Sequence, residues 1–339
     1  MLAIVKENEG IEYKIKDVEI PIINDNEVLI KVKTVGICGT DVPILKGLRK
    51  VNYPLIPGHE FAGDIVEVGK NVKNYKVGDR VSPAIVIGCG DCDYCRMGIE
   101  TLCDNIIETG IHVDGAFAEY VKVPEKVLHK IPENMDYEIG ASIDPIASAY
   151  RPIKKAQITS KDTVLVFGPG PIGLYTVQLA KAEGAKSVII VGVDGDEERL
   201  ELAKTLGADF SINISKEDLI EKVSLYTNGQ MADVVMEVTG NEKVFELCID
   251  TVKKSGKILL VGINHKPTVS NIEKIVRKEI KLEGSICYTW LDYRECINLV
   301  EAGKISVKPL ISHRFKLEEI DKAMIEIDQK NTIKVMLNL

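Results

Sequence analysis

The chain has 339 residues, a length typical of two domains. Lys and Arg number 43 against 51 Asp and Glu, and the resulting net charge of −8 argues against nucleic acid or an anionic membrane as the main partner. The composition, with 45 % hydrophobic and 28 % charged residues, is that of a globular protein, and no run reaches the ~18 apolar residues that a membrane helix needs.

The N-terminal segment turns acidic within its first nine residues, which does not fit a signal peptide with a basic start and a long apolar stretch. We therefore expect a cytoplasmic protein. Thiols stay reduced in that compartment, so the eight cysteines are interpreted as metal ligands, nucleophiles or core residues rather than disulfides.

The first part of the chain is rich in short strand patterns that Gly and Pro interrupt, as in irregular β-rich folds. The predicted strands are Val28–Val35, Ile65–Val68, Val81–Pro83, Phe117–Val123 and Val127–Ile131.

After about Thr159, strand and helix patterns alternate, which predicts βαβ units and a parallel sheet covered on both faces. The predicted strands are Thr163–Phe167, Ser187–Val193, Phe210–Ile214, Ala232–Val238 and Lys257–Val261. The predicted helices are Ile172–Gly184, Glu197–Leu206 and Asn241–Lys254. The last part of the chain contains an amphipathic stretch, Tyr293–Glu301, and a final strand near Ile333–Leu337.

A G-x-G-x-x-G motif joins the first strand of this second part to its helix. Gly168 permits a tight turn, Gly170 lets the backbone approach a pyrophosphate, and Gly173 allows close packing of helix and strand. Pro171 suits the first position of the helix, and Ile172 follows it, so that free N–H groups face the phosphates. The motif therefore predicts a dinucleotide site; an ordinary Gly-rich turn is the alternative.

The next strand ends at Asp194, 21 residues after Gly173. A carboxylate there accepts hydrogen bonds from ribose hydroxyls and repels a 2′-phosphate, which favours NAD over NADP. Asp194 as a helix cap is the alternative. Arg199 is the one cation nearby in the sequence, and we expect it to pack on the adenine.

Four cysteines, Cys89, Cys92, Cys95 and Cys103, follow the spacing C-x2-C-x2-C-x7-C. Four thiolates in a reducing compartment fit a closed tetrahedral zinc site with a structural role. An iron–sulfur cluster also uses C-x2-C-x2-C, but the fourth spacing and the dinucleotide motif favour zinc.

Two Gly-rich segments contain further metal-binding residue types: Cys38, Thr40 and Asp41 in G-I-C-G-T-D, and His59 with Glu60 in G-H-E. Each segment alone is weak evidence. Together with the four-cysteine segment, the Gly-rich turn and the tail from Val307 to Phe315, they make the chain resemble the zinc-dependent medium-chain alcohol and polyol dehydrogenases.

The resemblance implies a fold in which a Rossmann domain, with its doubly wound parallel sheet, is inserted into a GroES-like β-rich catalytic domain. The catalytic domain would comprise residues 1–145, with the zinc lobe at 89–103, and residues 289–339; the nicotinamide domain would comprise 146–288. It also implies a homo-oligomer, a tetramer or a dimer.

The resemblance also assigns the site residues. Cys38 and His59 would bind a catalytic zinc, and Glu60 would bind it directly or support it from behind. Asp144 stands where relatives have Cys or Glu, so it is a further candidate ligand, with a pre-proline turn as the alternative. Thr40 would bond the substrate oxygen, and Asp41 would orient a ligand loop.

The chain departs from the family pattern at Pro43, where many relatives have a proton-relaying His, and at Cys287, where sorbitol dehydrogenases have Arg. The Asp-x-Pro pattern resembles the sugar-alcohol-phosphate branch. Arg49 and Lys50 are candidates for a substrate phosphate, with a solvated basic loop as the alternative.

These observations predict a zinc- and NAD-dependent dehydrogenase that converts a secondary alcohol of a polyol, sugar or polyol phosphate into a ketone. Threonine or butanediol dehydrogenase-like activity, and a non-catalytic NAD-binding scaffold, are the alternatives. A zinc-ribbon nucleic-acid binder would explain only the four cysteines. The remaining histidines, His112, His129, His265 and His313, are predicted to lie in turns or at the surface, and Cys248 and Cys296 in the core.

Overall fold

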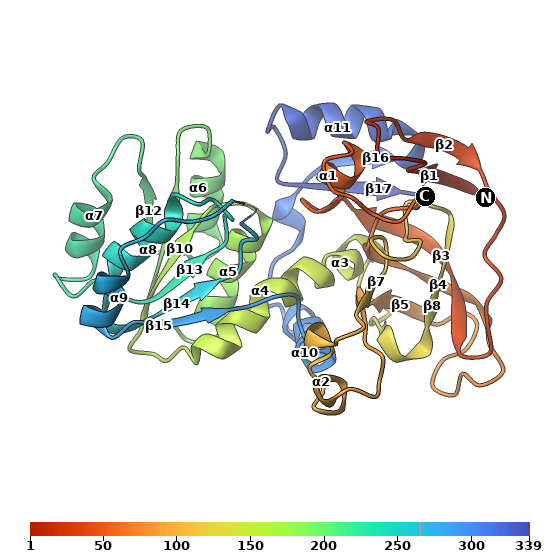
Figure 1. Cartoon of the computed structure of the whole chain (residues 1–339), viewed down its shortest axis with the longest axis horizontal. Coiled ribbons are helices and arrows are strands. Elements are labelled where there is room, and N and C mark those ends of the chain that lie inside the picture. The colour runs from red at the N-terminus through yellow and green to blue at the C-terminus, as the bar shows by residue number, and fades with distance from the viewer. Residues whose placement is uncertain (265) are drawn as a thin grey trace. The chain divides into compact units, whose positions relative to one another are not determined.

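The computed structural model describes residues 1–264 and 266–339 (Figure 1). His265, predicted to lie in a turn or at the surface, is outside the described residues. The chain forms two compact units: unit 1 comprises Met1–Asp144, Thr289–Glu301 and Val307–Leu339, and unit 2 comprises Pro145–Tyr288 and Ala302–Ser306. Within the described ranges, no helix has both the length and the apolar character needed to cross a membrane.

Unit 1 is built on a seven-stranded sheet with the order β16-β17-β3-β4-β5-β9, in which β8 also pairs with β3. Its strands are β3 (Glu27–Gly36), β4 (Glu60–Val68), β5 (Arg80–Pro83), β8 (Tyr120–Pro124), β9 (Leu128–Lys130), β16 (Ile311–Lys316) and β17 (Lys334–Asn338). Two small sheets pair β1 (Leu2–Val5) with β2 (Lys14–Asp17), and β6 (Val86–Ile87) with β7 (Ile107–Glu108).

The helices of unit 1 are short, apart from one twelve-residue helix near the end of the chain. They are α1 (Asp41–Leu45), α2 (Asp93–Arg96), α3 (Tyr137–Ala141), α10 (Trp290–Glu301) and α11 (Ile320–Asp328), with 3-10 turns η1 (Glu100–Leu102), η2 (Glu125–Val127), η3 (Lys308–Leu310) and η4 (Leu317–Glu319). Figure 1 shows α11 beside β16 and β17, and both chain ends lie in this unit.

Unit 2 contains a six-stranded, entirely parallel sheet with the order β12-β11-β10-β13-β14-β15. Its strands are β10 (Thr163–Phe167), β11 (Ser187–Gly192), β12 (Phe210–Asn213), β13 (Ala232–Glu237), β14 (Val252–Leu260) and β15 (Lys281–Gly284). The helices are α4 (Ile143–Ala156), which starts at the end of unit 1, and α5 (Pro171–Ala182), α6 (Glu197–Thr205), α7 (Leu219–Tyr226), α8 (Val244–Thr251) and α9 (Ile272–Lys278).

The predicted α/β class with a parallel sheet is confirmed. All five residues of β10 are buried, as expected for a central strand that is covered on both faces. The helix predicted over Asn241–Lys254 is shorter than expected, because Val252, Lys253 and Lys254 already belong to β14. The elements that the sequence prediction missed include the helices α4, α7, α9 and α11 and the strand β15. Cys248 and Cys296 are fully buried, as predicted.

The surface prediction for His129 is wrong. His129 is 1 % exposed, and its ring contacts those of Tyr293 and Trp290, with centroid distances of 4.5 and 4.7 Å. In the described part of the chain neither ring nitrogen has a hydrogen-bond partner. Desolvation, followed by the charge of Arg294, lowers the pKa of His129 from 6.5 to about 3.

This buried neutral histidine makes stability depend on pH. Because the unfolded chain binds a proton at His129 below about pH 6.5 and the folded chain does not until about pH 3, stability is full above that window and falls as the pH drops through it. The slope reaches at most ~1.4 kcal/mol per pH unit. We expect His129→Phe, which keeps the ring contacts, to remove this contribution to the pH dependence of stability.

The measurement is the urea midpoint of both proteins at pH 7, 6 and 5, followed by the fluorescence of Trp290, the one tryptophan of the chain. All other titrating groups are shared, so the wild type should lose more stability on acidification than the variant. Parallel curves would contradict the assignment.

Candidate functional site

The pairing of β3 with β4 brings the two predicted metal-binding segments together. Gly36, the last residue of β3, lies opposite Glu60, the first residue of β4. Cys38 follows β3 directly, and His59 precedes β4. A ligand atom of Cys38, one of His59 and one of Glu60 consequently all lie within 4.8 Å of one another.

Asp41 connects two of these residues from behind. Its Oδ2 accepts a 2.8 Å hydrogen bond from the backbone N–H of Cys38, and its Oδ1 lies 3.4 Å from Nδ1 of His59. With Nδ1 facing a carboxylate, Nε2 is the ring nitrogen that remains for a metal. Asp41 is fully buried, so it holds the ligand loop and the imidazole in place.

The two donors shift each other's protonation. Burial alone would lower the pKa of His59, but the charges of Asp41 and Cys38 raise it well above its ordinary value. Burial alone would raise the pKa of Cys38, but the neighbouring His59 lowers it. Thiolate character at Cys38 is what a metal ligand requires.

Lys334 is a member of this centre that the sequence analysis missed. It stands at the start of β17, is 2 % exposed, forms an ion pair with Oε2 of Glu60, and donates a 3.1 Å hydrogen bond to the carbonyl of Ile37. Burial lowers its pKa to about 8. The signal in the sequence that could have revealed it is a single lysine at the start of the apolar final strand.

Gly36 makes this arrangement possible. A Cβ at position 36 would lie 2.5 Å from Oε2 of Glu60 and 2.8 Å from Cε of Lys334. The backbone of β3 therefore has to pass the ion pair without a side chain.

Thr40 and Asp144 are the two remaining residues of unit 1 that the sequence analysis assigned to the catalytic site. Thr40 is half-buried, and its side chain makes no hydrogen bond to the helix α1 that it precedes. Asp144 is buried, but it is not part of the group formed by Cys38, His59 and Glu60. It lies instead in the first turn of α4. Burial of Tyr293 raises the pKa of that residue, and the charge of Asp144 raises it further.

The sulfur, imidazole and carboxylate donors of the centre fit a zinc ion chemically. The buried His59 Nδ1 and Asp41 Oδ1, which make no hydrogen bond within the described chain, face each other as a ligand and its supporting carboxylate do.

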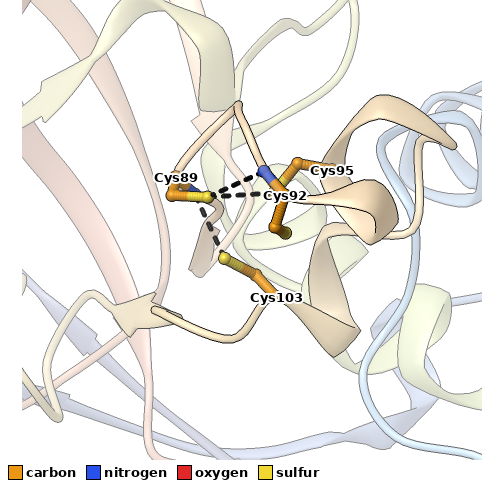
Figure 2. A group of neighbouring side chains, drawn as sticks. All are labelled: Cys89, Cys92, Cys95 and Cys103. Carbon is orange, nitrogen blue, oxygen red and sulfur yellow. Dashed lines mark hydrogen bonds between the residues drawn. The ribbon is translucent and has the colours of Figure 1, made fainter.

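The second donor group is the four-cysteine lobe around α2 and η1 (Figure 2). The four Sγ atoms of Cys89, Cys92, Cys95 and Cys103 all lie within 4.8 Å of one another. The backbone N–H of Cys89 donates to Sγ of Cys103 at 3.2 Å, and the N–H of Cys92 donates to Sγ of Cys89 at 3.4 Å.

Cys89 and Cys95 of this lobe differ in protonation. The backbone N–H of Asp91, with that of Cys92, lowers the pKa of Cys89 to about 6, whereas desolvation raises the pKa of Cys95 to about 12. Cys89 is therefore a thiolate at neutral pH, whereas Cys95 would become one only with a positive charge among the sulfurs. A closed set of four sulfurs fits structural zinc and leaves no position for a substrate.

The dinucleotide motif of unit 2 has the predicted geometry. Gly168 begins the turn after β10 with φ +103°, a value that only glycine adopts easily. A Cβ on Gly173 would come within 1.8 Å of the Gly168 carbonyl oxygen, so the helix packs against the turn only with glycine there. Gly170 is the N-cap of α5, Pro171 its first residue, and Ile172 its second.

Asp194 follows β11 and is exposed, but it is not alone. Its Oδ1 accepts a 3.0 Å hydrogen bond from Nδ2 of Asn213 and lies 3.2 Å from Nζ of Lys216, which also contacts Glu197 at 2.7 Å. Arg199 pairs with Asp196 at 3.3 Å. Arg199 is the one cation near Asp194 in the sequence, but it is not the one nearest in the structure. The loop after β12 brings Lys216 next to Asp194.

Comparison with known proteins fits both units. A family model described as the alcohol dehydrogenase GroES-like domain matches residues 24–133, and one described as zinc-binding dehydrogenase matches residues 171–302. Sorbitol dehydrogenase of Halalkalibacterium halodurans is 37 % identical over 340 residues, covering 99 % of each chain.

D-arabitol-phosphate dehydrogenase of Enterococcus avium is 37 % identical over 325 residues, covering 95 % of this chain and 92 % of the relative. The NADP-bound crystal structure of a zinc-binding dehydrogenase family protein from Sinorhizobium meliloti superposes with a TM-score of 0.93 at 31 % identity, covering 100 % and 99 % of the two chains. The protein belongs to the zinc-dependent medium-chain alcohol dehydrogenase family. The resemblance seen in the sequence is confirmed, as is the GroES-like plus Rossmann fold.

The two donor sets predict two zinc ions per chain, which metal analysis of the purified protein measures. We expect Cys38→Ser to lose one zinc and keep its fold. Cys103→Ser should lose the other, and its thermal midpoint should fall by at least about 5 °C, because structural zinc stabilises the loop that binds it.

Cys287→Ser is the matched control, since Cys287 is outside both groups, and it should keep both ions. Equal metal content in Cys38→Ser and the wild type would exclude a zinc at Cys38.

Proposed function

We propose that this protein is a zinc- and NAD-dependent dehydrogenase that oxidises a secondary alcohol of a polyol, sugar or polyol phosphate reversibly to the ketone. The observation that carries the proposal is the convergence of Cys38, His59 and Glu60 in a chain that also has the Gly168–Gly173 turn. A non-catalytic scaffold would have no need of such a donor set.

The proposed ligands of the catalytic zinc are Cys38, His59 and Glu60, and those of the structural zinc are the four lobe cysteines. Asp144 remains a prediction as a ligand, because its carboxylate is outside the group. When bound, zinc supplies a Lewis acid that lowers the pKa of an alcohol, and the nicotinamide supplies a hydride acceptor.

The chain's own residues then position and deprotonate the substrate. Asp41 keeps His59 in the tautomer that leaves Nε2 for the metal, and Lys334 holds one oxygen of Glu60. Thr40, whose hydroxyl does not cap α1, accepts the alcohol proton into a hydrogen-bonded path. Pro43 cannot continue that path as a histidine would, so the path would end in water, in ribose hydroxyls or at another side chain.

The proposed organisation follows the family: residues 1–145 and 289–339 as catalytic domain, residues 146–288 as nicotinamide domain. We propose a cytoplasmic homo-oligomer, a dimer or tetramer. All four residues of the edge strand β15 are exposed, including Leu282 at 43 %, and an open strand edge of this kind favours pairing with a second copy.

Formation of NADH with a panel of polyols, their phosphates, threonine and 2,3-butanediol tests the proposed activity. We expect turnover of at least one secondary alcohol, loss of turnover in Cys38→Ser, and a kcat about 100-fold lower in Thr40→Val with zinc content unchanged. A zinc-loaded, NAD-binding protein that turns over none of these compounds would instead be a scaffold.

The cofactor preference is a separate prediction. Asp194 and Glu197 surround Lys216, so the acidic side chains remain in excess where an adenosine ribose would bind. We expect kcat/KM to favour NAD, and Asp194→Ala to reduce the NAD-to-NADP ratio about tenfold, since hydrogen bonds to a charged acceptor contribute ~1.5–3 kcal/mol. Glu201→Ala, which removes an exposed carboxylate of α6, should leave the ratio unchanged. A tenfold preference of the wild type for NADP would refute the assignment.

A further inference from the structure

Unit 1 has a polar cavity that is separate from the donor group and is lined by two cationic side chains. Its volume is about 280 Å³, and it is lined by Arg49, Lys50, Val51, Asn52, Ile111 and His112. Two segments far apart in the sequence form it, residues 49–52 and residues 111–112.

Both segments are anchored close to the catalytic donors. The backbone N–H groups of Leu48 and Arg49 donate to the carbonyl of Pro43, at 2.8 and 3.0 Å, which folds the chain back onto α1, the helix that starts directly after Thr40.

On the other side, Gly110 packs against the residue that precedes His59. A Cβ at position 110 would come within 2.6 Å of the Gly58 carbonyl oxygen. Ile111 and His112 follow Gly110 in this turn, so the cavity wall is attached to both ligand segments of the centre.

Arg49 is half-buried, and none of the ion pairs found in the described chain involves its guanidinium. Lys50 lies 3.3 Å from Glu9, but both side chains are largely exposed, and such a pair contributes little. In a protein whose net charge is −8, a cavity lined by the two cationic side chains Arg49 and Lys50 is a local exception.

His112 adds a directed donor. Its Nδ1 accepts a 3.0 Å hydrogen bond from the backbone N–H of Glu108, so in the neutral ring the proton is on Nε2. The Glu108 carboxylate lies 3.6 Å from the same Nδ1 and therefore on the side of the ring away from Nε2. Nε2–H remains a donor for a ligand.

We propose that this cavity binds the phosphate of a polyol phosphate whose secondary alcohol reacts at the metal centre. The inference rests on the proposed function and narrows its substrate to the phosphate monoesters. Arg49, Lys50, Asn52 and His112 supply hydrogen-bond donors to a group with three terminal oxygens, and the planar guanidinium suits two of them at once. A neutral polyol would not need this charge.

A carboxylate, as in threonine, presents only two oxygens and is the competing anion. The test separates the two with probes that do not require turnover. Calorimetric titration of the zinc-loaded protein with inorganic phosphate, and in parallel with acetate, measures anion binding at the cavity. Arg49→Ala, Arg49→Lys and Lys73→Ala are compared with the wild type, Lys73 being an exposed lysine of the same unit that does not line the cavity.

We expect phosphate to bind more tightly than acetate, with about 10- to 100-fold weaker phosphate binding in Arg49→Ala, the range of a charged hydrogen bond. Arg49→Lys should recover part of the loss, and Lys73→Ala should match the wild type. In NADH assays, Arg49→Ala should lower kcat/KM for a pentitol or hexitol phosphate at least tenfold more than for the free polyol, mainly through KM.

Turnover of free polyols together with equal phosphate affinity in wild type and Arg49→Ala would overturn the phosphate site and leave the proposed function standing. Acetate binding as tight as phosphate, with threonine turned over in preference to every polyol phosphate, would overturn it in favour of a carboxylate. Loss of phosphate binding in Arg49→Ala without turnover of any alcohol would count against the proposed function, and the substrate inference would fall with it.

Discussion

The antiparallel register of three strands determines the metal centre. Gly36 of β3 pairs with Glu60 of β4 on one side and with Met336 of β17 on the other. A shift of one residue in either pairing would turn the side chains of that strand to the opposite face of the sheet. The relative positions of Cys38 and His59 depend on the pairing of β3 with β4, and the position of Lys334 depends on the pairing of β3 with β17.

The charges of this centre are balanced only in part. Cys38, Asp41 and Glu60 are acidic groups, and His59 and Lys334 are the basic groups that face them. Burying charged groups is costly unless they are paired, and loss of one partner of a buried pair costs about 3–5 kcal/mol. A divalent cation among Cys38, His59 and Glu60 offsets the remaining negative charge, so the environment that makes the site unfavourable without an ion favours binding of one.

The sequence was sufficient to predict those features of the structure whose residues lie close together in the chain. The Gly168–Gly173 turn, the spacing of the four cysteines and the buried run of β10 are each contained within a few residues, and the structure shows the expected turn, sulfur cluster and strand. It was insufficient for partners distant in the chain. Lys334 meets Glu60 across 274 positions, and Lys216 reaches Asp194 through strand order; no periodicity reports either contact. His129 was misplaced for the same reason, since its burial depends on α10.

The separation of 274 positions between Glu60 and Lys334 also has a consequence for biosynthesis. A ribosome adding ~5–20 residues per second needs about 14–55 s to cover that distance. During this time Cys38, His59 and Glu60 have already been translated, while the strand that neutralises Glu60 has not. In a nascent chain these donors are therefore available to cellular metals well before Lys334 can pair with Glu60, which makes the order of metal binding and strand pairing a question of translation kinetics.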